Sequence, residues 1–254
     1  MYIKQFTTTY FDLHLRNMTI PLVVLAALAP VAWLLWTIYK KDRAQPEPAK
    51  WLVKAFVYGV LSAVLSFTIS IPIGIVLGMD IDAQTYSSPL EAVADAFLLA
   101  AIPEELAKFF MLWLLLRKNP FFDEHFDGIV YTVCIGLGFA ALENIIYLLG
   151  GIKDWSWVGI GITRAFVSVP AHYFFAILMG YYYSIYHFGK GRSAKTKSMI
   201  LVAPILAHGI FDSILFSMQT NESLSGLLMI FFIIFFTKLK KVAKEKVDKF
   251  KLTS

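Results

Sequence analysis

Residues Gly128–Leu149, GIVYTVCIGLGFAALENIIYLL, indicate the class of fold. It contains a single charged side chain, Glu143. As an α-helix it would extend about 33 Å at about 1.5 Å per residue, which matches the hydrocarbon core of a bilayer. Its apolar residues form a continuous run and do not alternate with polar ones. The pattern therefore favours a transmembrane helix over a strand of a β-barrel.

The composition of the whole chain supports the same conclusion. Of its 254 residues, 58% are hydrophobic and 16% are charged. A soluble domain has about 45–50% apolar and about 25% charged residues, and a chain of this size cannot hide so much apolar surface in a water-soluble core. A soluble enzyme and a disordered chain are excluded. A disulfide scaffold is excluded as well, because Cys134 is the only cysteine.

Seven apolar stretches are long enough to cross the membrane, so we expect an all-α polytopic bundle of about seven spans that forms one membrane domain over residues 1–254. The expected spans are Pro21–Tyr39, Trp51–Met79, Leu90–Leu116, Gly128–Leu149, Val158–Tyr186, Met199–Ser217 and Leu224–Lys238.

Charged residues outside the spans predict the orientation. Lys and Arg concentrate in the first, third and fifth connections and in residues 238–254, whereas the second and sixth connections carry acidic residues and no base. By the positive-inside rule, the N-terminus lies outside and residues 238–254 form a basic cytoplasmic tail. The net charge of +5 is thereby explained by membrane topology, and no nucleic-acid partner is expected.

Several polar side chains fall inside the expected spans, where each ionisable group costs about 2.5–3.5 kcal/mol to insert. Counting along the helices places the Glu, His and Asp residues among them in one slab near the midplane or just outside it. Mutual pairing around a wet cavity would offset the cost, so they form a candidate active site. They are Glu104, Glu105, Lys108, Glu143, Asn144, His172, His208 and Asp212.

Local spacing shows which of these side chains share a helix face. Glu104 and Glu105 lie four and three residues before Lys108, so both can reach it. The two glutamates point about 100° apart, so one can face a cavity while the other pairs with Lys108. His208 and Asp212 are four residues apart, so the carboxylate can orient the imidazole. We expect Asn144 to form an interhelical hydrogen bond.

Glutamate and histidine together suit hydrolysis, because they can activate water and return a proton to a leaving amine. Two histidines and a carboxylate can also hold Zn²⁺ with an open position for water. A proton- or ion-coupled transporter could use the same buried groups, although no inverted repeat supports it. A non-catalytic membrane chaperone or sensor is a third hypothesis.

The arrangement of motifs between about residues 100 and 215 resembles the PrsW family of intramembrane proteases. More distantly it is similar to the CAAX prenyl proteases and their bacteriocin-processing relatives, in which a histidine stands where this chain has Glu143. The matching motifs are Glu104-Glu105-x-x-Lys108, Phe126-Asp127-Gly128-Ile129-Val130-Tyr131, Gly136-Leu137-Gly138-Phe139-Ala140-Ala141-Leu142-Glu143-Asn144, His172 and His208-Gly209-Ile210-Phe211-Asp212.

This resemblance implies an intramembrane endopeptidase in the cytoplasmic membrane of a prokaryote. The implied substrate is a membrane-bound anti-sigma factor, which such enzymes cut first. Glu104 is then the leading base and Glu105 its support, while His208 and Asp212 bind water, metal or the developing oxyanion.

The resemblance leaves two mechanisms open. The family is classified with metalloproteases, whereas a metal-free glutamate mechanism is argued for the wider group. We expect a single Zn²⁺ held by some of Glu143, His172 and His208. Arg164, eight residues before His172, either steers a substrate carbonyl or anchors the helix at the membrane interface.

Overall fold

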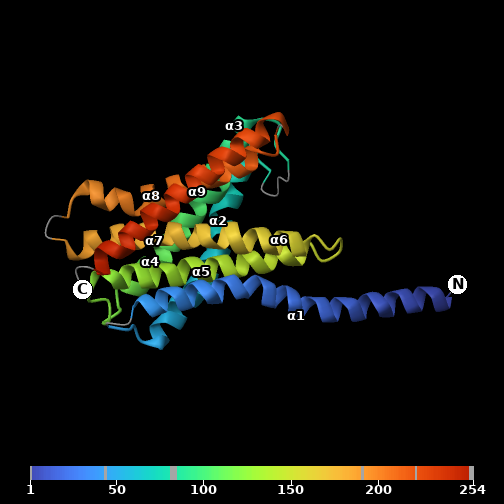
Figure 1. Cartoon of the computed structure of the whole chain (residues 1–254), viewed down its shortest axis with the longest axis horizontal. Helices are drawn as coiled ribbons and strands as arrows, with labels where there is room; N and C mark the ends of the chain where they lie inside the picture. Colours follow the sequence, from blue (N-terminus) through green and yellow to red (C-terminus); the bar gives the residue numbers. More distant parts are fainter. Residues whose placement is uncertain (1, 43–44, 81–84, 190–191, 221, 252–254) are drawn as a thin grey trace.

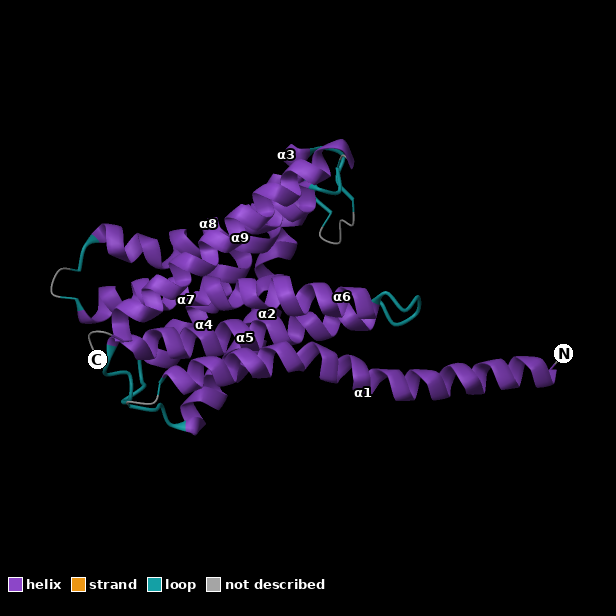
Figure 2. Cartoon of the chain, viewed as in Figure 1, coloured by secondary structure: helices purple, strands orange, loops and turns teal. Residues whose placement is uncertain are grey.

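A computed structural model describes the backbone of residues 2–42, 45–80, 85–189, 192–220 and 222–251, and the side chains from residue 19 to residue 250 within these ranges. Every regular element in these ranges is helical (Figure 2), so the expected all-α fold is confirmed. The elements are α1 (Tyr2–Lys41), α2 (Ala49–Leu77), α3 (Pro89–Asp95), the π-helical turn η1 (Ala96–Ala101), α4 (Ile102–Leu116), α5 (His125–Gly150), α6 (Trp157–Thr163), the π-helical turn η2 (Arg164–Ser168), α7 (Val169–Phe188), α8 (Ala194–Ser217) and α9 (Glu222–Lys251).

Six helical segments in the described part of the chain are long and apolar enough to cross a membrane. They are Thr19–Lys41, Ala49–Leu77, His125–Gly150, Trp157–Phe188, Ala194–Ser217 and Glu222–Phe250. The remaining expected span, Leu90–Leu116, coincides with the uninterrupted helical run of α3, η1 and α4. This run carries Glu104, Glu105 and Lys108, and it is the seventh candidate span.

Both π-helical turns come directly before a proline-containing helix start. Pro103 follows η1, and Pro170 follows η2. Proline has no backbone N–H, so it cannot donate to the carbonyl one turn earlier. A π-turn accommodates an extra residue at such a point. Glu104 lies three residues after η1, and His172 lies four residues after η2.

Helix α5 lies at the centre of the bundle and packs against α2 on one side and α7 on another. Its residues from Phe126 to Ala141 are buried. The α2 and α5 backbones approach closely at two glycines. A Cβ atom on Gly59 would lie 2.0 Å from the Ile135 carbonyl oxygen, and one on Gly138 would lie 2.1 Å from the Phe56 carbonyl oxygen. Small residues allow transmembrane helices to pack this closely.

The Gly138→Ala substitution is expected to lower the free energy of unfolding by about 1–3 kcal/mol, because the obstructing atom belongs to the backbone and cannot rotate away. Gly159→Ala is the matched control, since a Cβ there meets nothing within 4 Å. Thermal unfolding in detergent measures both variants. Equal melting temperatures for the two variants would contradict the close approach of α2 and α5.

Successive connections between the long helices lie at opposite ends of the bundle, as the alternating loop charges predict. The α1–α2, α4–α5 and α7–α8 connections lie at the same end as the C-terminus, and the α5–α6 and α8–α9 connections lie at the other end with the N-terminus (Figure 1). The basic segment 238–254 continues α9 as far as Lys251. Its apolar side, which includes Ala243 and Val247, packs into the core that contains Tyr181.

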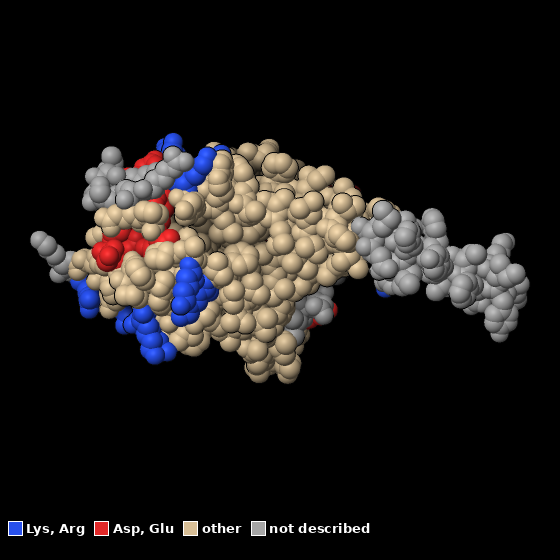
Figure 3. All heavy atoms as spheres, turned by 90° about the horizontal axis from the view of Figure 1, so that it is seen from below, with Lys and Arg blue, Asp and Glu red and all other residues tan. Residues whose placement is uncertain are grey.

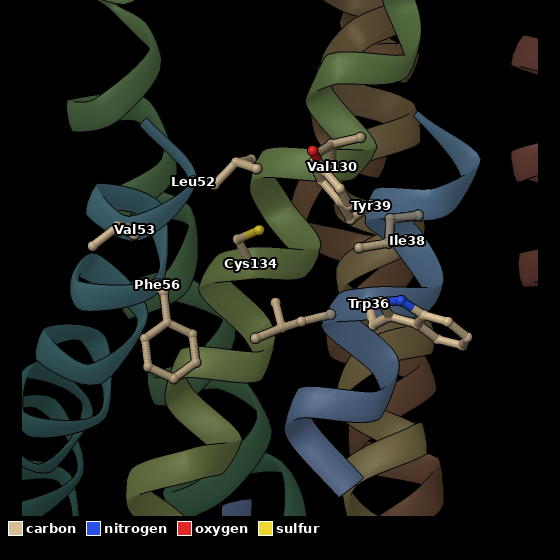
Figure 4. A pocket seen from close by; sticks show the side chains of 9 residues that line it. Trp36, Ile38, Tyr39, Leu52, Val53, Phe56, Val130 and Cys134 are labelled. Carbon is tan, nitrogen blue, oxygen red and sulfur yellow. The ribbon is translucent and has the colours of Figure 1, made fainter. Parts of the chain in front are cut away.

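An apolar cavity of about 360 Å³ lies between α1, α2 and α5 (Figure 4). Trp36 and Tyr39 border it from α1, Phe56 from α2, and Val130 and Cys134 from α5. None of the lining side chains is a carboxylate or a histidine. The cavity is therefore separate from the polar cluster that the sequence singles out.

Candidate active site

The cluster begins with three side chains on α4. The Lys108 Nζ atom lies 2.8 Å from Glu105 Oε1 and 3.2 Å from Glu104 Oε2. Glu105 is fully buried, whereas the Glu104 side chain is 15% exposed. The ammonium also lies 3.9 Å from the centre of the Phe139 ring, which adds a cation–π contact. The i, i+3 and i, i+4 spacing therefore gives both of the expected ion pairs, and of the two glutamates only Glu104 is partly exposed.

His208 on α8 joins this group through both ring nitrogens. Its Nδ1 atom lies 3.0 Å from Glu105 Oε1, and its Nε2 atom lies 3.0 Å from Asp212 Oδ2 and 3.9 Å from Glu104 Oε2. The ring stacks on Phe175 with centroids 4.7 Å apart. Ionised carboxylates only accept hydrogen bonds, so both nitrogens of His208 donate and the ring is an imidazolium in this network.

His172 on α7 connects α4 with α5. Its Nδ1 atom lies 3.2 Å from Lys108 Nζ, and its Nε2 atom lies 2.9 Å from Glu143 Oε2. A lysine ammonium can only donate, so Nδ1 accepts and the protonated Nε2 donates to the carboxylate. This contact network assigns a neutral His172 with a defined tautomer.

Glu143 is held from its other side by a chain of polar groups. Arg164 Nη2 donates to Glu143 Oε2 at 2.5 Å, and Arg164 Nε donates to Asn144 Oδ1 at 2.6 Å. Asn144 Nδ2 donates in turn to the Ala27 carbonyl oxygen at 3.1 Å, which is the expected interhelical hydrogen bond, here to α1. Arg164 also lies over the Tyr147 ring. These contacts orient Glu143 and hence His172.

The structure thus joins all the side chains that the sequence singles out into one network across α4, α5, η2, α7 and α8. Phe175 and Tyr147 also contact the cluster, although neither belongs to the sequence motifs. Their spacing from the polar residues on the same helix could have identified them. Phe175 lies three residues after His172, and Tyr147 lies four residues after Glu143, so each shares a face with a polar side chain of the cluster.

The group best placed to hold a metal ion differs from the expected set. Among the described residues, one ligand atom each from Glu104, His172 and His208 lies within 4.8 Å of the other two. Glu143 is not in this group, and its Oε2 atom is bound by Arg164 and His172. The geometry therefore favours Glu104 over Glu143 as the carboxylate ligand.

The donor set fits a zinc-like ion. Zinc sites in hydrolases commonly use histidine nitrogen and carboxylate oxygen ligands, with one position left open. Each histidine here has a carboxylate on the ring nitrogen that would point outward, Glu105 for His208 and Glu143 for His172. Such partners orient metal-binding histidines. To free the two metal-binding nitrogens, Lys108 Nζ would have to move away from His172 Nδ1, and His208 Nε2 would have to give up its proton and its contact with Asp212.

Comparison with known proteins decides the family. The sequence pattern described as "PrsW family intramembrane metalloprotease" matches residues 47–239, which include the whole polar cluster. The chain belongs to this family. It is 34% identical over 228 residues to Protease PrsW of Clostridioides difficile, covering 89% of this chain and 90% of that protein.

Two further relatives carry the same name and are about as similar to this chain. Identity to Protease PrsW of Geobacillus kaustophilus is 34%, with 88% of this chain and 92% of that protein covered. Identity to Protease PrsW of Bacillus subtilis is 32%, with 76% and 82% covered. No solved structure matches the chain significantly. The chain is therefore a multi-pass prokaryotic intramembrane protease of a metalloprotease family, and nothing found supports the transporter alternative.

Proposed function

We propose that Glu104, His172 and His208 form the catalytic centre of this endopeptidase, which hydrolyses a peptide bond in or near the membrane segment of a substrate protein. One observation carries the proposal. Three potential ligand atoms from α4, α7 and α8 approach within 4.8 Å inside an apolar bundle. Polar groups at such a depth are expensive and are kept for function.

Glu104 acts as the base. Its described contacts, with Lys108 and His208, all involve Oε2. The Oε1 atom is thereby left to take a proton from the attacking water. The water oxygen adds to the carbonyl carbon, the C–N bond breaks, and the same glutamate returns the proton to the leaving amine. Glu105 is fully buried and acts as a positioning residue that holds Lys108 and His208.

A metal ion, for which we propose Zn²⁺, would be held by Glu104, His172 and His208, and it would supply Lewis-acid polarisation of the scissile carbonyl and acidification of water. Glu143 positions the imidazole of His172, and Arg164 positions Glu143. Asp212 orients His208 and, like Glu104, is partly exposed.

The proposed substrate is a single-span membrane protein such as an anti-sigma factor, and the proposed location is the cytoplasmic membrane with the N-terminus outside. The orientation is supported by the Lys and Arg residues at the end of the bundle that carries the C-terminus. The substrate class is supported by the family relationship.

Reconstitution with a doubly tagged single-span substrate tests this function. The protein is expected to release two fragments, to lose activity after chelation, and to regain it when Zn²⁺ is restored. A variant with Cys134→Ser is the matched control and should cut at the unmodified rate, since Cys134 lies outside the polar cluster. Ion flux without any cleavage would contradict the proposal. Full activity with far less than one equivalent of metal would contradict the proposed role of the metal, but not the role of Glu104 as the base.

A further inference from the structure

A second group of carboxylates meets where α1 ends and α5 begins. Asp42 directly follows α1, Glu124 precedes α5, and Asp127 lies in the first turn of α5. One oxygen of each lies within 4.8 Å of the other two. Acidic side chains gather at this end of the molecule, with Lys and Arg side chains nearby (Figure 3). Asp127 and Glu143 are about 24 Å apart along α5, so this group is separate from the active site.

Two of these carboxylates are buried, and each keeps one oxygen without a partner. Asp42 is 2% exposed and Asp127 is 0% exposed. Asp127 Oδ2 accepts the backbone N–H groups of Asp123 at 3.0 Å and Glu124 at 2.8 Å, and Asp42 Oδ2 accepts that of Glu47 at 3.1 Å. The Oδ1 atoms of Asp42 and Asp127 have no hydrogen-bond partner among the described residues. Buried polar atoms without a partner are rare in folded proteins, and a bound ion is one explanation for them.

Glu47 brings a fourth carboxylate close to this group. It is buried, it accepts a hydrogen bond from the Tyr131 hydroxyl, and it interacts with Asp127. Burial raises the pKa of Asp42 to about 6 and that of Glu47 to about 8. Burial thus disfavours the charged forms of both carboxylates, and a bound positive ion would stabilise those charged forms.

We propose that Asp42, Glu124 and Asp127 bind a divalent cation of the class that prefers oxygen ligands, which includes Mg²⁺, Mn²⁺ and Ca²⁺. The three side chains offer only oxygen, which such hard cations prefer. Glu124 is partly exposed, so water can complete the coordination shell from that side. The ion ties the connection after α1 to the first turn of α5, the helix that carries Glu143 at its far end.

Manganese titration followed by electron paramagnetic resonance tests this site on the full chain in detergent. The double substitution His172→Ala and His208→Ala first removes the other metal-binding group. One Mn²⁺ per chain should bind, and Mg²⁺ or Ca²⁺ should displace it. Adding Asp42→Asn and Glu124→Gln should weaken Mn²⁺ binding at least tenfold. Both changes keep an oxygen that accepts the existing backbone hydrogen bonds. Asp123→Asn, which removes an exposed carboxylate from the same loop, should change nothing.

A second measurement on the otherwise unmodified chain covers the case in which the histidine variants do not fold. About 10 mM Mg²⁺ exceeds even weak dissociation constants of about 1 mM. It should raise the melting temperature of the unmodified protein and of Asp123→Asn, but not of the Asp42→Asn, Glu124→Gln variant. Equal shifts in all three proteins, or no shift in the unmodified protein, would overturn the proposal, as would equal Mn²⁺ affinity in the variant and its control.

Discussion

Replacement of Glu104 by Gln is expected to slow peptide cleavage by about 10²–10⁴-fold. Glutamine has nearly the same shape and can still accept a hydrogen bond from Lys108, but it cannot take a proton from water. The change should lower kcat with little effect on the amount of folded protein, since the side chain is the more accessible of the two adjacent glutamates. Single-turnover cleavage of a tagged substrate in membranes gives the rate directly.

Glu91→Gln is the control for this substitution. Glu91 lies in the first turn of α3 and is exposed, so its loss should leave the cleavage rate unchanged. The role of Glu104 as the base is wrong if the two variants cut equally fast. His208→Ala offers a separate check, because it removes a proposed metal ligand. It should reduce both the cleavage rate and the metal content, whereas Glu104→Gln should lower the rate more than it lowers metal binding.

Much of the fold follows from local sequence because span length and helical spacing are local properties. The apolar run around Gly128–Leu149 predicts α5, and the spacing of Glu104, Glu105 and Lys108 predicts their ion pairs. Convergence of the buried carboxylates and histidines at one depth also follows, since isolated groups at that depth would be too costly.

The sequence could not predict which side chains on different helices bind one another. Arg164, the first residue of η2, binds Glu143 and Asn144, and the approach of η2 to α5 has no local signal in the sequence. Glu143 is bound by Arg164, and Glu104 is the carboxylate that lies beside the two histidines. From the motifs we expect Glu143, and not Glu104, in that position.

The substitution Lys108→Met is expected to lower the free energy of unfolding of metal-free protein by about 3–5 kcal/mol, because it leaves the fully buried Glu105 without its ammonium partner. Methionine has a similar length, so packing against Phe139 is largely kept. Unfolding of chelator-treated protein in detergent measures the loss. Lys118→Met, in the α4–α5 connection, is the control and should have little effect.

A double substitution separates charge from packing. Adding Glu105→Gln to Lys108→Met removes the carboxylate charge that lost its ammonium partner, while an amide oxygen can still accept from His208 Nδ1, so most of the lost stability should return. The single Lys108→Met variant should also bind Zn²⁺ at least tenfold more tightly, because the ammonium no longer competes for Glu104 and His172 Nδ1. A variant that loses stability, is not rescued by Glu105→Gln and binds metal no better would show that Lys108 acts through packing. In that case the metal and the ammonium do not share a site.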